Sequence, residues 1–173
     1  ALLIGTLWGA IAGWGGGRVD EVMMRMVDAL YALPFMFVVI LLMVVFGRSI
    51  LLVFIGIGAV EWLTMARVVR GQVMQVKARP FILAAEAAGS PARVTLIRHV
   101  LPNIAGVALA YLMLTLPQVV MVESFLSFLG LGVQEPMTSL GILVKDGADD
   151  MDLMPHALLV PGGVLVALLL CLT

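Results

Sequence analysis

The carboxylates Glu61 and Glu123 are the ionisable side chains that this sequence places nearest to the hydrocarbon of a membrane, at or close to the ends of long apolar stretches. Placing a carboxylate in hydrocarbon costs about 2.5–3.5 kcal/mol on insertion scales, so such a group usually faces water or the interior of a helix bundle. Both residues are therefore candidates for a polar path or a helix contact. Their positions near the ends of the apolar stretches are equally consistent with a simple interfacial location.

The other reactive side chains do not form a catalytic pattern. His99 follows Arg98, and we expect it to pack or hydrogen-bond locally, although an imidazole titrates near physiological pH. We expect no metal role for His156, and we expect the single cysteine, Cys171, to be a small buried hydrophobic residue. No Ser-His-Asp, Cys-His or paired-carboxylate arrangement is present, and the glycines at 15–17 lack the Gly-Lys-Ser/Thr of a phosphate loop. The sequence predicts neither catalysis nor a metal or nucleotide site.

These residues belong to a strongly apolar chain. Of its 173 residues, 62% are hydrophobic and 12% are charged, and the mean hydropathy is +1.15. A soluble domain is normally about half apolar, with about a quarter of its residues charged. A globular core cannot cover so much apolar surface, so we expect the chain to be inserted in a membrane.

Five stretches are long and apolar enough to suggest membrane-spanning helices: 1–17, 29–47, 49–66, 99–122 and 153–173. Crossing about 30 Å of hydrocarbon takes ~20 helical residues. Only helices or closed barrels satisfy the backbone in lipid, and these stretches lack the alternation of barrel strands. The predicted fold is all-α, a polytopic transmembrane helical bundle with five helices. Because the sequence starts and stops within apolar runs, we expect it to be a fragment of a longer chain.

The distribution of Lys and Arg predicts the orientation of this bundle. The segments 18–28 and 67–98, which lie on one side of the membrane, hold eight of the ten cationic residues. The positive-inside rule places that side in the cytoplasm and makes 67–102 the main cytoplasmic loop. The segment 134–155 carries five carboxylates and one lysine, and we expect it to be an external loop.

Local residue types predict a helix, a turn and a second helix inside the cytoplasmic loop. Pro80 suits the first turn of a helix, and Gly89 suits the left-handed position just past its end. Ser90 is expected to cap a second helix whose first residue is Pro91.

The second helix is expected to be amphipathic and to lie at the membrane surface. Val94, Ile97 and Leu101 would share its apolar face. Pro102 would close the loop before the next span.

The segment "ESFLSFLGLGV", 123–133, is too polar for simple lipid contact and too apolar for a free loop. Irregular backbone at membrane depth must be buried in protein or line a cavity, so we interpret this segment as re-entrant or pore-lining. The candidates for a translocation path are Glu61, Glu123, Ser124, Phe125, Ser127 and Phe128.

The loop 67–102 resembles the EAA loop of bacterial ABC-importer permeases. That family's pattern is Glu-Ala-Ala, three residues, Gly, nine residues, an apolar position, any residue and Leu-Pro. Counted from Gly89, nine residues end at Arg98, and "HVLP" completes the pattern at Pro102. Five stretches are further similar to the C-type permease subunit of oligopeptide and dipeptide importers: "GWGGGRVDEVMMRMVDALYALP", "EWLTMARVVRGQ", "IRHVLPN", "ESFLSFLGLGVQEP" and "VPGG".

The register of this resemblance places the motif Glu-Ala-Ala on Leu83-Ala84-Ala85, three residues before the visible "EAAG". Glu86 lies about one helical turn after Leu83, on roughly the same face, and is a candidate to replace the missing motif glutamate. The candidates for coupling to an ATPase are Leu83, Ala84, Ala85, Glu86, Gly89, Ser90, Arg93, Arg98, His99 and Pro102.

The resemblance implies six transmembrane helices per subunit, of which this sequence would lack the first, together with the cytoplasmic tail. It implies a second permease subunit in a heterodimer, two cytoplasmic ABC ATPase subunits, an external substrate-binding protein and a peptide substrate. ATP and Mg would be bound by the ATPases, so this chain would bind no cofactor and would not be an enzyme. It would be a multi-pass protein of the bacterial cytoplasmic (inner) membrane, in contact with lipid and with no nucleic acid. The helix around 80–90 would seat in a groove of one ATPase and drive alternating access.

Two alternatives remain open at this point. Permeases of the same branch also carry other cargoes, such as nickel and glycosides. A non-transporting membrane scaffold or receptor could also use such a loop to recruit a partner, and a flexible loop would favour that interpretation over a lever.

Overall fold

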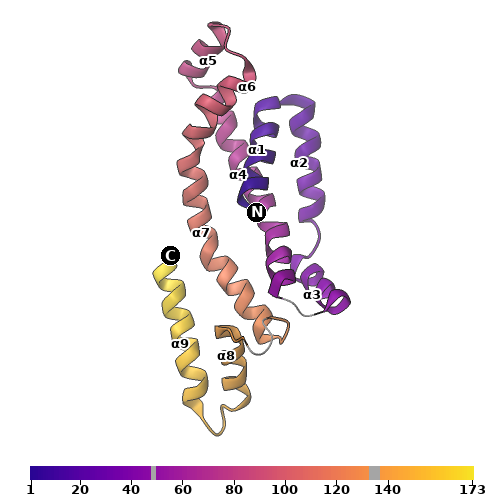
Figure 1. Cartoon of the computed structure of the whole chain (residues 1–173), viewed down its shortest axis with the longest axis vertical. Helices are drawn as coiled ribbons and strands as arrows, with labels where there is room; N and C mark the ends of the chain where they lie inside the picture. The colour runs from indigo at the N-terminus through magenta and orange to yellow at the C-terminus, as the bar shows by residue number, and fades with distance from the viewer. Residues whose placement is uncertain (48–49, 133–136) are drawn as a thin grey trace. The chain divides into compact units, whose positions relative to one another are not determined.

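The computed structural model describes residues 1–47, 50–132 and 137–173, and every regular element within these ranges is helical (Figure 1). This confirms the predicted all-α class. The helices in chain order are α1 (Leu2–Gly15), α2 (Gly17–Tyr31), α3 (Phe35–Phe46), α4 (Ile50–Lys77), α5 (Pro80–Ala87), α6 (Ala92–Thr95), the π-helical turn η1 (Leu96–Val100), α7 (Leu101–Phe128), α8 (Leu140–Asp149) and α9 (Pro155–Leu172).

The chain divides into two compact units, each of which is built from two stretches of sequence. Unit 1 comprises Ala1–Leu33 and Gly58–Leu112. Unit 2 comprises Pro34–Ile57 and Met113–Thr173. Two of the three divisions therefore fall inside the long helices α4 and α7, and the third falls at a proline.

In unit 1, helix α1 packs against α4 along a stripe of glycines at positions 5, 9 and 13. A Cβ atom on Gly9 would overlap the carbonyl oxygen of Ala66, and one on Gly13 would lie 2.8 Å from the carbonyl oxygen of Arg70. The spacing of four residues places these glycines on one face of α1. The two backbones approach closely because no side chain separates them, as is common between membrane helices.

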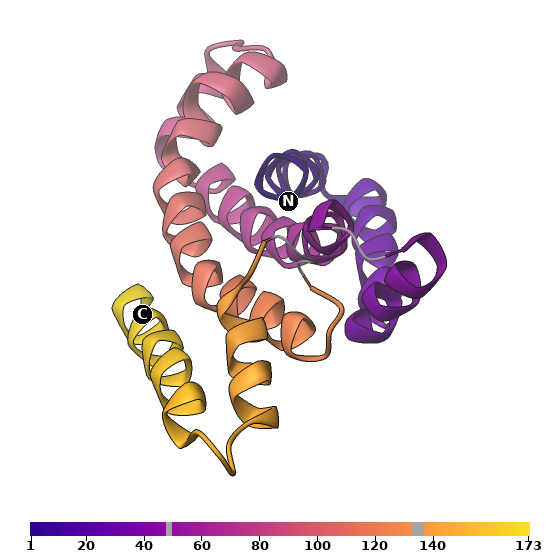
Figure 2. The same cartoon turned by 60° about the horizontal axis from the view of Figure 1, so that its bottom comes forward.

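Helix α2 lies beside α1 in unit 1 (Figures 1 and 2). The indole Nε1 of Trp8 in α1 donates a hydrogen bond of 3.3 Å to the carbonyl oxygen of Met23 in α2. Val27 of α2 is fully buried and clusters with Leu63 and Ala66 of α4. The α1–α2 hairpin thus packs against the second half of α4.

One core in unit 1 joins α1, α4, α5, η1 and the start of α7. Val73 of α4, Ile82 of α5 and Val100 of η1 are each 0% exposed and belong to the same buried cluster as Ala10 of α1. Burying an aliphatic side chain of this size contributes about 1.5–3 kcal/mol. The short helix α5 is therefore anchored in the core of the unit, not suspended in a free loop.

In unit 2, helix α3 packs with the first part of α4 and the end of α7. Val39 and Met43 of α3, Val53 of α4 and Leu126 of α7 are all buried in one cluster. Helices α8 and α9 form a hairpin, in which a Cβ atom on Gly147 would overlap the carbonyl oxygen of Ala157. Helix α8 occupies most of the described part of the segment 134–155, which we expected to be a loop.

Among the described residues, three helices are long and apolar enough to cross a membrane: Leu51–Lys77, Ala92–Phe128 and Pro155–Leu172. The pair α2–α3 provides a fourth span if both parts are counted together, and they meet at an angle of 67°. Helix α1, with 14 residues, is apolar but shorter. Length and composition therefore support three spans, or up to four, where the sequence predicted five.

The predicted continuous helix over 29–47 is wrong, because the chain breaks between Tyr31 and Phe35. Pro34 has φ −68° and ψ 98° and precedes the first residue of α3. A proline lacks the N–H that would continue a helix and disfavours helical geometry at the residue before it, here Leu33.

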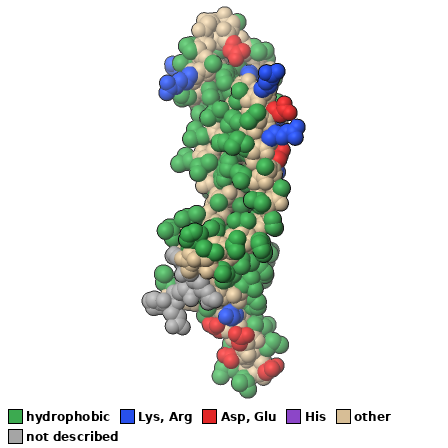
Figure 3. Space-filling model, turned by 90° about the vertical axis from the view of Figure 1, so that its right-hand side faces the viewer, with side chains coloured by type: hydrophobic (Ala, Val, Ile, Leu, Met, Phe, Trp, Pro, Cys, Tyr) green, Lys and Arg blue, Asp and Glu red, His purple; other side chains and the backbone are tan. Residues whose placement is uncertain are grey.

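Charged side chains gather at particular places within each unit, while hydrophobic side chains cover much of the rest of the visible surface (Figure 3). In unit 1 they gather towards the end of the unit that carries α5. In unit 2 acidic side chains gather around α8 and the turn that follows it. The exposed large hydrophobic residues include Leu3, Phe37, Leu114, Leu159 and Leu170, as expected for helices that face lipid or another membrane subunit.

Candidate functional site

Helix α5 begins where the sequence predicted. Arg79, the residue before it, is extended with φ −77° and ψ 144°, and Pro80 occupies the first helical position. Proline is favoured there because its missing N–H would have no partner within the helix and its fixed φ suits the first turn. The amide of Arg79 donates to the carbonyl oxygen of Val76 at 3.0 Å, so only a tight turn separates α4 from α5.

The end of α5 is closed by a Schellman motif centred on Gly89. Gly89 has φ +82°, as its predicted left-handed position requires. Its amide donates to the carbonyl oxygen of Glu86 at 2.9 Å, and the amide of Ser90 donates to that of Ala85 at 3.0 Å. These two bonds satisfy carbonyls at the helix end and define a rigid exit.

The second helix of the loop starts one residue later than predicted. Helix α6 begins at Ala92, preceded by Pro91 with φ −61° and ψ 139°, and no side chain caps it. The hydroxyl of Ser90 instead accepts a hydrogen bond of 3.0 Å from the hydroxyl of Thr95. The prediction that Ser90 caps the helix and that Pro91 is its first residue is therefore wrong, because Pro91 is extended.

Pro102 does not close the loop as predicted. The helical run continues from Ala92 through Pro102 to Phe128, with the π-helical turn η1 directly before Leu101. Pro102 has no N–H to donate to the carbonyl oxygen of Arg98, and its ring would clash with that oxygen in a regular helix. The wider π turn just before it accommodates the proline without a break, and the Asn103 side chain donates a hydrogen bond of 2.7 Å to the next carbonyl oxygen, that of His99.

The π turn also determines which residues of this helix are buried within the protein. Of the predicted membrane-facing residues Val94, Ile97 and Leu101, Val94 and Ile97 are 43% and 52% exposed, so this face remains available to lipid. Thr95 and Val100, five residues apart, are fully buried within the protein. A π turn places residues i and i+5 in register, which the regular helical period used for the prediction does not.

Helix α5 has a buried anchor, and most of the candidate coupling residues around it are exposed. On α5, the side chains of Leu83, Ala84 and Glu86 are exposed and Ala85 is half-buried, whereas Ile82 is fully buried. Leu83 and Glu86, one turn apart, thus both face outward, as expected from their spacing. The remaining candidates follow on the next helical run: Arg93, Arg98 and Pro102 are exposed, and His99 is half-buried.

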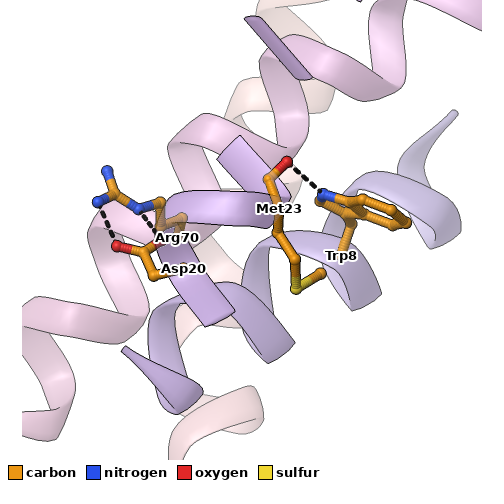
Figure 4. Close-up of polar contacts among 4 residues, drawn as sticks. All are labelled: Trp8, Asp20, Met23 and Arg70. Carbon is orange, nitrogen blue, oxygen red and sulfur yellow. Dashed lines mark hydrogen bonds and ion pairs between the residues drawn. The ribbon is translucent and has the colours of Figure 1, made fainter. Parts of the chain in front are cut away.

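Beside this loop, α4 binds the α1–α2 hairpin through a partly buried ion pair. The guanidinium of Arg70 donates from Nε and from one terminal nitrogen to the two carboxylate oxygens of Asp20 (Figure 4). Asp20 is only 7% exposed. Two-pronged Arg–carboxylate pairs are among the stronger polar contacts in proteins and fix geometry as well as charge.

Two further cations of α4 reinforce this attachment. Arg67 donates to Asp28 of α2 at 2.8 Å and lies over the ring of Tyr31, 4.3 Å from its centre. Lys77 donates to the carbonyl oxygen of Trp14 in α1 at 2.7 Å. We call the contacts Asp20–Arg70, Asp28–Arg67 and Trp14–Lys77 the polar clamp.

The polar clamp was not predicted from the sequence, because membrane topology alone accounted for the cations of α4. Two signals were available. Asp20 and Asp28 are carboxylates in a segment assigned to the basic side, and glycines recur every four residues from Gly5 to Gly13. The partners of both features lie at least 39 residues away along the chain, and a single sequence does not indicate such pairings.

The candidate residues for the translocation path lie in both units. Glu61 belongs to unit 1, where it is half-buried on α4. The other five belong to unit 2 and lie on the last turns of α7, so the expected irregular, re-entrant backbone does not begin before Leu129. The hydroxyl of Ser127 donates to Glu123 at 2.7 Å and that of Ser124 at 3.5 Å. Ser124 and Ser127 are buried, whereas Phe125 and Phe128 are exposed; residues 133–136 of this motif lie outside the described part.

The apolar helices, the tightly packed glycine stripe and the ordered loop with its glycine exit define a multi-pass helical membrane protein. Residues 5–173 match the family described as "Binding-protein-dependent transport system inner membrane component". The match covers almost the whole chain, and the chain belongs to this family.

Relatives within the family are named as peptide permeases. The chain is 47% identical over 173 residues to the "Oligopeptide transport system permease protein OppC" of Haemophilus influenzae, covering 100% of this chain and 54% of that protein. It is 51% identical over 156 residues to the protein of the same name from Escherichia coli K12, covering 90% and 52%.

A dipeptide permease is also similar. The chain is 43% identical over 145 residues to the "Dipeptide transport system permease protein DppC" of Bacillus subtilis, covering 84% of this chain and 45% of that protein. The chain thus spans about half the length of these relatives. The resemblance to permeases of the oligopeptide and dipeptide branch is confirmed.

Proposed function

We propose that this chain is part of the permease subunit of an ATP-driven importer, which moves oligopeptides or dipeptides into the cytoplasm. Its family membership and the names of its relatives support a transport role and a peptide cargo. These relatives are transport permeases, so the chain provides a path and a lever, and chemistry belongs to other subunits.

The observation that carries the proposal is the construction of α5. Hydrogen bonds close its C-terminal end, Ile82 anchors it in the core of unit 1, and Leu83 and Glu86 remain exposed. A helix that is fixed to membrane helices on one side and open on the other can transmit a push from a soluble partner. A flexible tether, which a scaffold could use equally well to recruit a partner, would lack both the anchor and the ordered exit. Such a lever works by favouring one of two arrangements of the spans.

The partners follow from this role. A second permease subunit would complete the path, and two cytoplasmic ABC ATPases, which bind ATP and Mg, would contact α5. An external substrate-binding protein would deliver the peptide. The chain itself would bind no cofactor and would lie in the bacterial cytoplasmic membrane, with α5 on the cytoplasmic side and α8 on the external side.

Part of the translocation path would run along the end of α7. The hydrogen bonds from Ser124 and Ser127 hold the Glu123 carboxylate on one face of this helix, while Phe125 and Phe128 are open to other groups. An aromatic surface next to an oriented carboxylate suits a peptide, which presents apolar side chains, amides and an ammonium end. Glu61 on α4 is the candidate from unit 1.

The test is transport by the full-length protein, co-purified with its partner subunits and reconstituted in proteoliposomes with its binding protein. Labelled short peptides should accumulate inside vesicles that are oriented for import when ATP is supplied to the ATPases. A non-hydrolysable ATP analogue is the matched control. Accumulation of nickel or a glycoside in place of peptide would refute the proposed cargo, and a purified complex without ATPase subunits would refute the lever.

A further inference from the structure

The cations of the polar clamp lie shortly before α5 along the chain, and the last part of α4 supports both. Arg70 and Lys77 belong to the last part of α4, and the tight turn after Lys77 leads directly into α5. Ile82 of α5 shares a buried cluster with Val73 and Val76 of the same part of α4. Any displacement of α5 therefore acts first on the stretch of α4 that holds the clamp.

The joint between α1 and α2 depends on the clamp for its position. The three residues of this joint, at 15–17, are all glycines, so no side chain there can pack against α4. Asp20, in the first turn of α2, is the first buried residue after the joint. Its two hydrogen bonds with Arg70 thus fix the start of α2 where packing does not.

The two ion pairs of the clamp differ in burial, which indicates which of them is the stronger. In the Asp20–Arg70 pair the carboxylate side chain is 10% exposed and the guanidinium side chain 35%. In the Asp28–Arg67 pair the corresponding values are 61% and 40%. Exposed pairs contribute little because water screens them, whereas a shielded two-pronged pair resists separation. Asp20 and Arg70 are therefore the main members of the clamp.

We propose that Asp20 and Arg70 are positioning residues for transport: they join the α1–α2 hairpin to the segment of α4 that carries α5, so that the hairpin moves with α5. This inference rests on the proposed function, because it assumes that a partner ATPase displaces α5. Breaking the pair would leave α5 able to bind and respond to the ATPase, but the hairpin would follow less completely. ATP hydrolysis would then continue with less peptide moved per ATP.

The experiment compares Asp20→Asn and Arg70→Gln with wild type in the full reconstituted complex. Peptide uptake and ATP hydrolysis are measured in the same vesicles and normalised to assembled complex recovered by size-exclusion chromatography. Peptide moved per ATP should fall below the wild-type value in both variants, while ATP hydrolysis by the assembled complex continues. The matched control is Glu21→Gln, which removes a pair on the same helix, Glu21–Arg25, that is 3.5 Å long and exposed on both sides.

Two further variants separate positioning from simple folding. Arg70→Lys keeps the charge but not the two-pronged geometry. The amount of peptide that it moves per ATP should lie between the values for wild type and Arg70→Gln. In a Cys171→Ser background, Asp20→Cys with Arg70→Cys joined by a short bis-maleimide should regain peptide moved per ATP, because a covalent link replaces the ion pair.

The proposal would be overturned if Asp20→Asn and Arg70→Gln moved as much peptide per ATP as wild type, or if Glu21→Gln lowered this quantity equally. A cross-linked complex that stays uncoupled would also overturn it, as would a failure of every Asp20 and Arg70 variant to assemble, which would assign the pair a purely structural role. Wild-type complex that hydrolyses ATP but moves no peptide would refute the proposed function instead.

Discussion

Replacing Gly89 by alanine is expected to loosen the exit of α5 without disturbing any packed side chain. Gly89 has φ +82°, and a Cβ atom built there meets nothing within 4 Å. The cost is therefore in the backbone, and a left-handed conformation costs an L-residue about 1–2 kcal/mol. Because each 1.4 kcal/mol is a factor of ten, the open form of this turn should become about 5- to 30-fold more populated.

Hydrogen exchange measured by mass spectrometry on the assembled complex reads this population directly. The amides of residue 89 and Ser90 are the two that donate the closing bonds, to Glu86 and Ala85. Their exchange should accelerate by the same 5- to 30-fold. Peptide moved per ATP should fall as well, because a loosened exit transmits less of the displacement of α5.

The matched control is Gly106→Ala. Gly106 lies inside α7, and a Cβ atom there also meets nothing within 4 Å, but alanine is favoured over glycine in a helix by about 1 kcal/mol. Exchange at residue 89 and Ser90 should therefore stay at the wild-type rate in this variant. Wild-type exchange and wild-type uptake in Gly89→Ala would show that the left-handed exit is not needed, and the lever argument would fail.

Three other substitutions test separate parts of the structure. Gly9→Leu should prevent the close approach of α1 to α4 and lower the yield of assembled complex, while Gly71→Ala, which has open space around it, should not; equal yields on size-exclusion chromatography would contradict the glycine stripe. Ile82→Ala should cost about 2–5 kcal/mol of local stability and speed proteolysis within α5, and wild-type protease resistance would show that α5 is held by other contacts. Glu86→Ala should reduce co-purification of the ATPase subunits if Glu86 takes the place of the motif glutamate, and unchanged co-purification would show that its exposure is incidental.

Local chemistry made the start and end of α5 predictable. Pro80 restricts its own backbone and Gly89 permits a left-handed turn, and the bonds that close the helix end join residues only a few positions apart. No information about the rest of the fold is needed for either feature. The all-α class followed equally directly from the length and apolarity of the spans.

The errors in prediction arose where one local signal competed with another. Ser90 is a good helix cap by type, but the extended Pro91 delays the helix and leaves the Ser90 hydroxyl to Thr95. Pro102 resembles a helix stop, yet the π turn before it lets the helix continue. Pro34 shows the opposite error. The sequence predicts that it lies within the span 29–47, whereas in the structure it interrupts the helix.

The polar clamp shows a limit of a different kind. Asp20 and Arg70 are 50 residues apart along the chain, and each has an ordinary local explanation, one as a helix-start carboxylate and the other as a positive-inside cation. Only the fold shows that they meet, because the glycine stripe brings α1 against α4 and thereby sets the place at which α2 begins.

The same stripe explains why the clamp can be strong in a membrane protein. Two charges gain from pairing only if their geometry is good and their desolvation is compensated, and a loosely packed pair would be no better than hydration by water. The close approach of α1 to α4 along Gly5, Gly9 and Gly13 brings the start of α2 next to Arg70, and the paired hydrogen bonds of Asp20 then fix its orientation. A larger residue at Gly13, whose Cβ would approach the Arg70 carbonyl, should therefore weaken the ion pair as well as the helix contact.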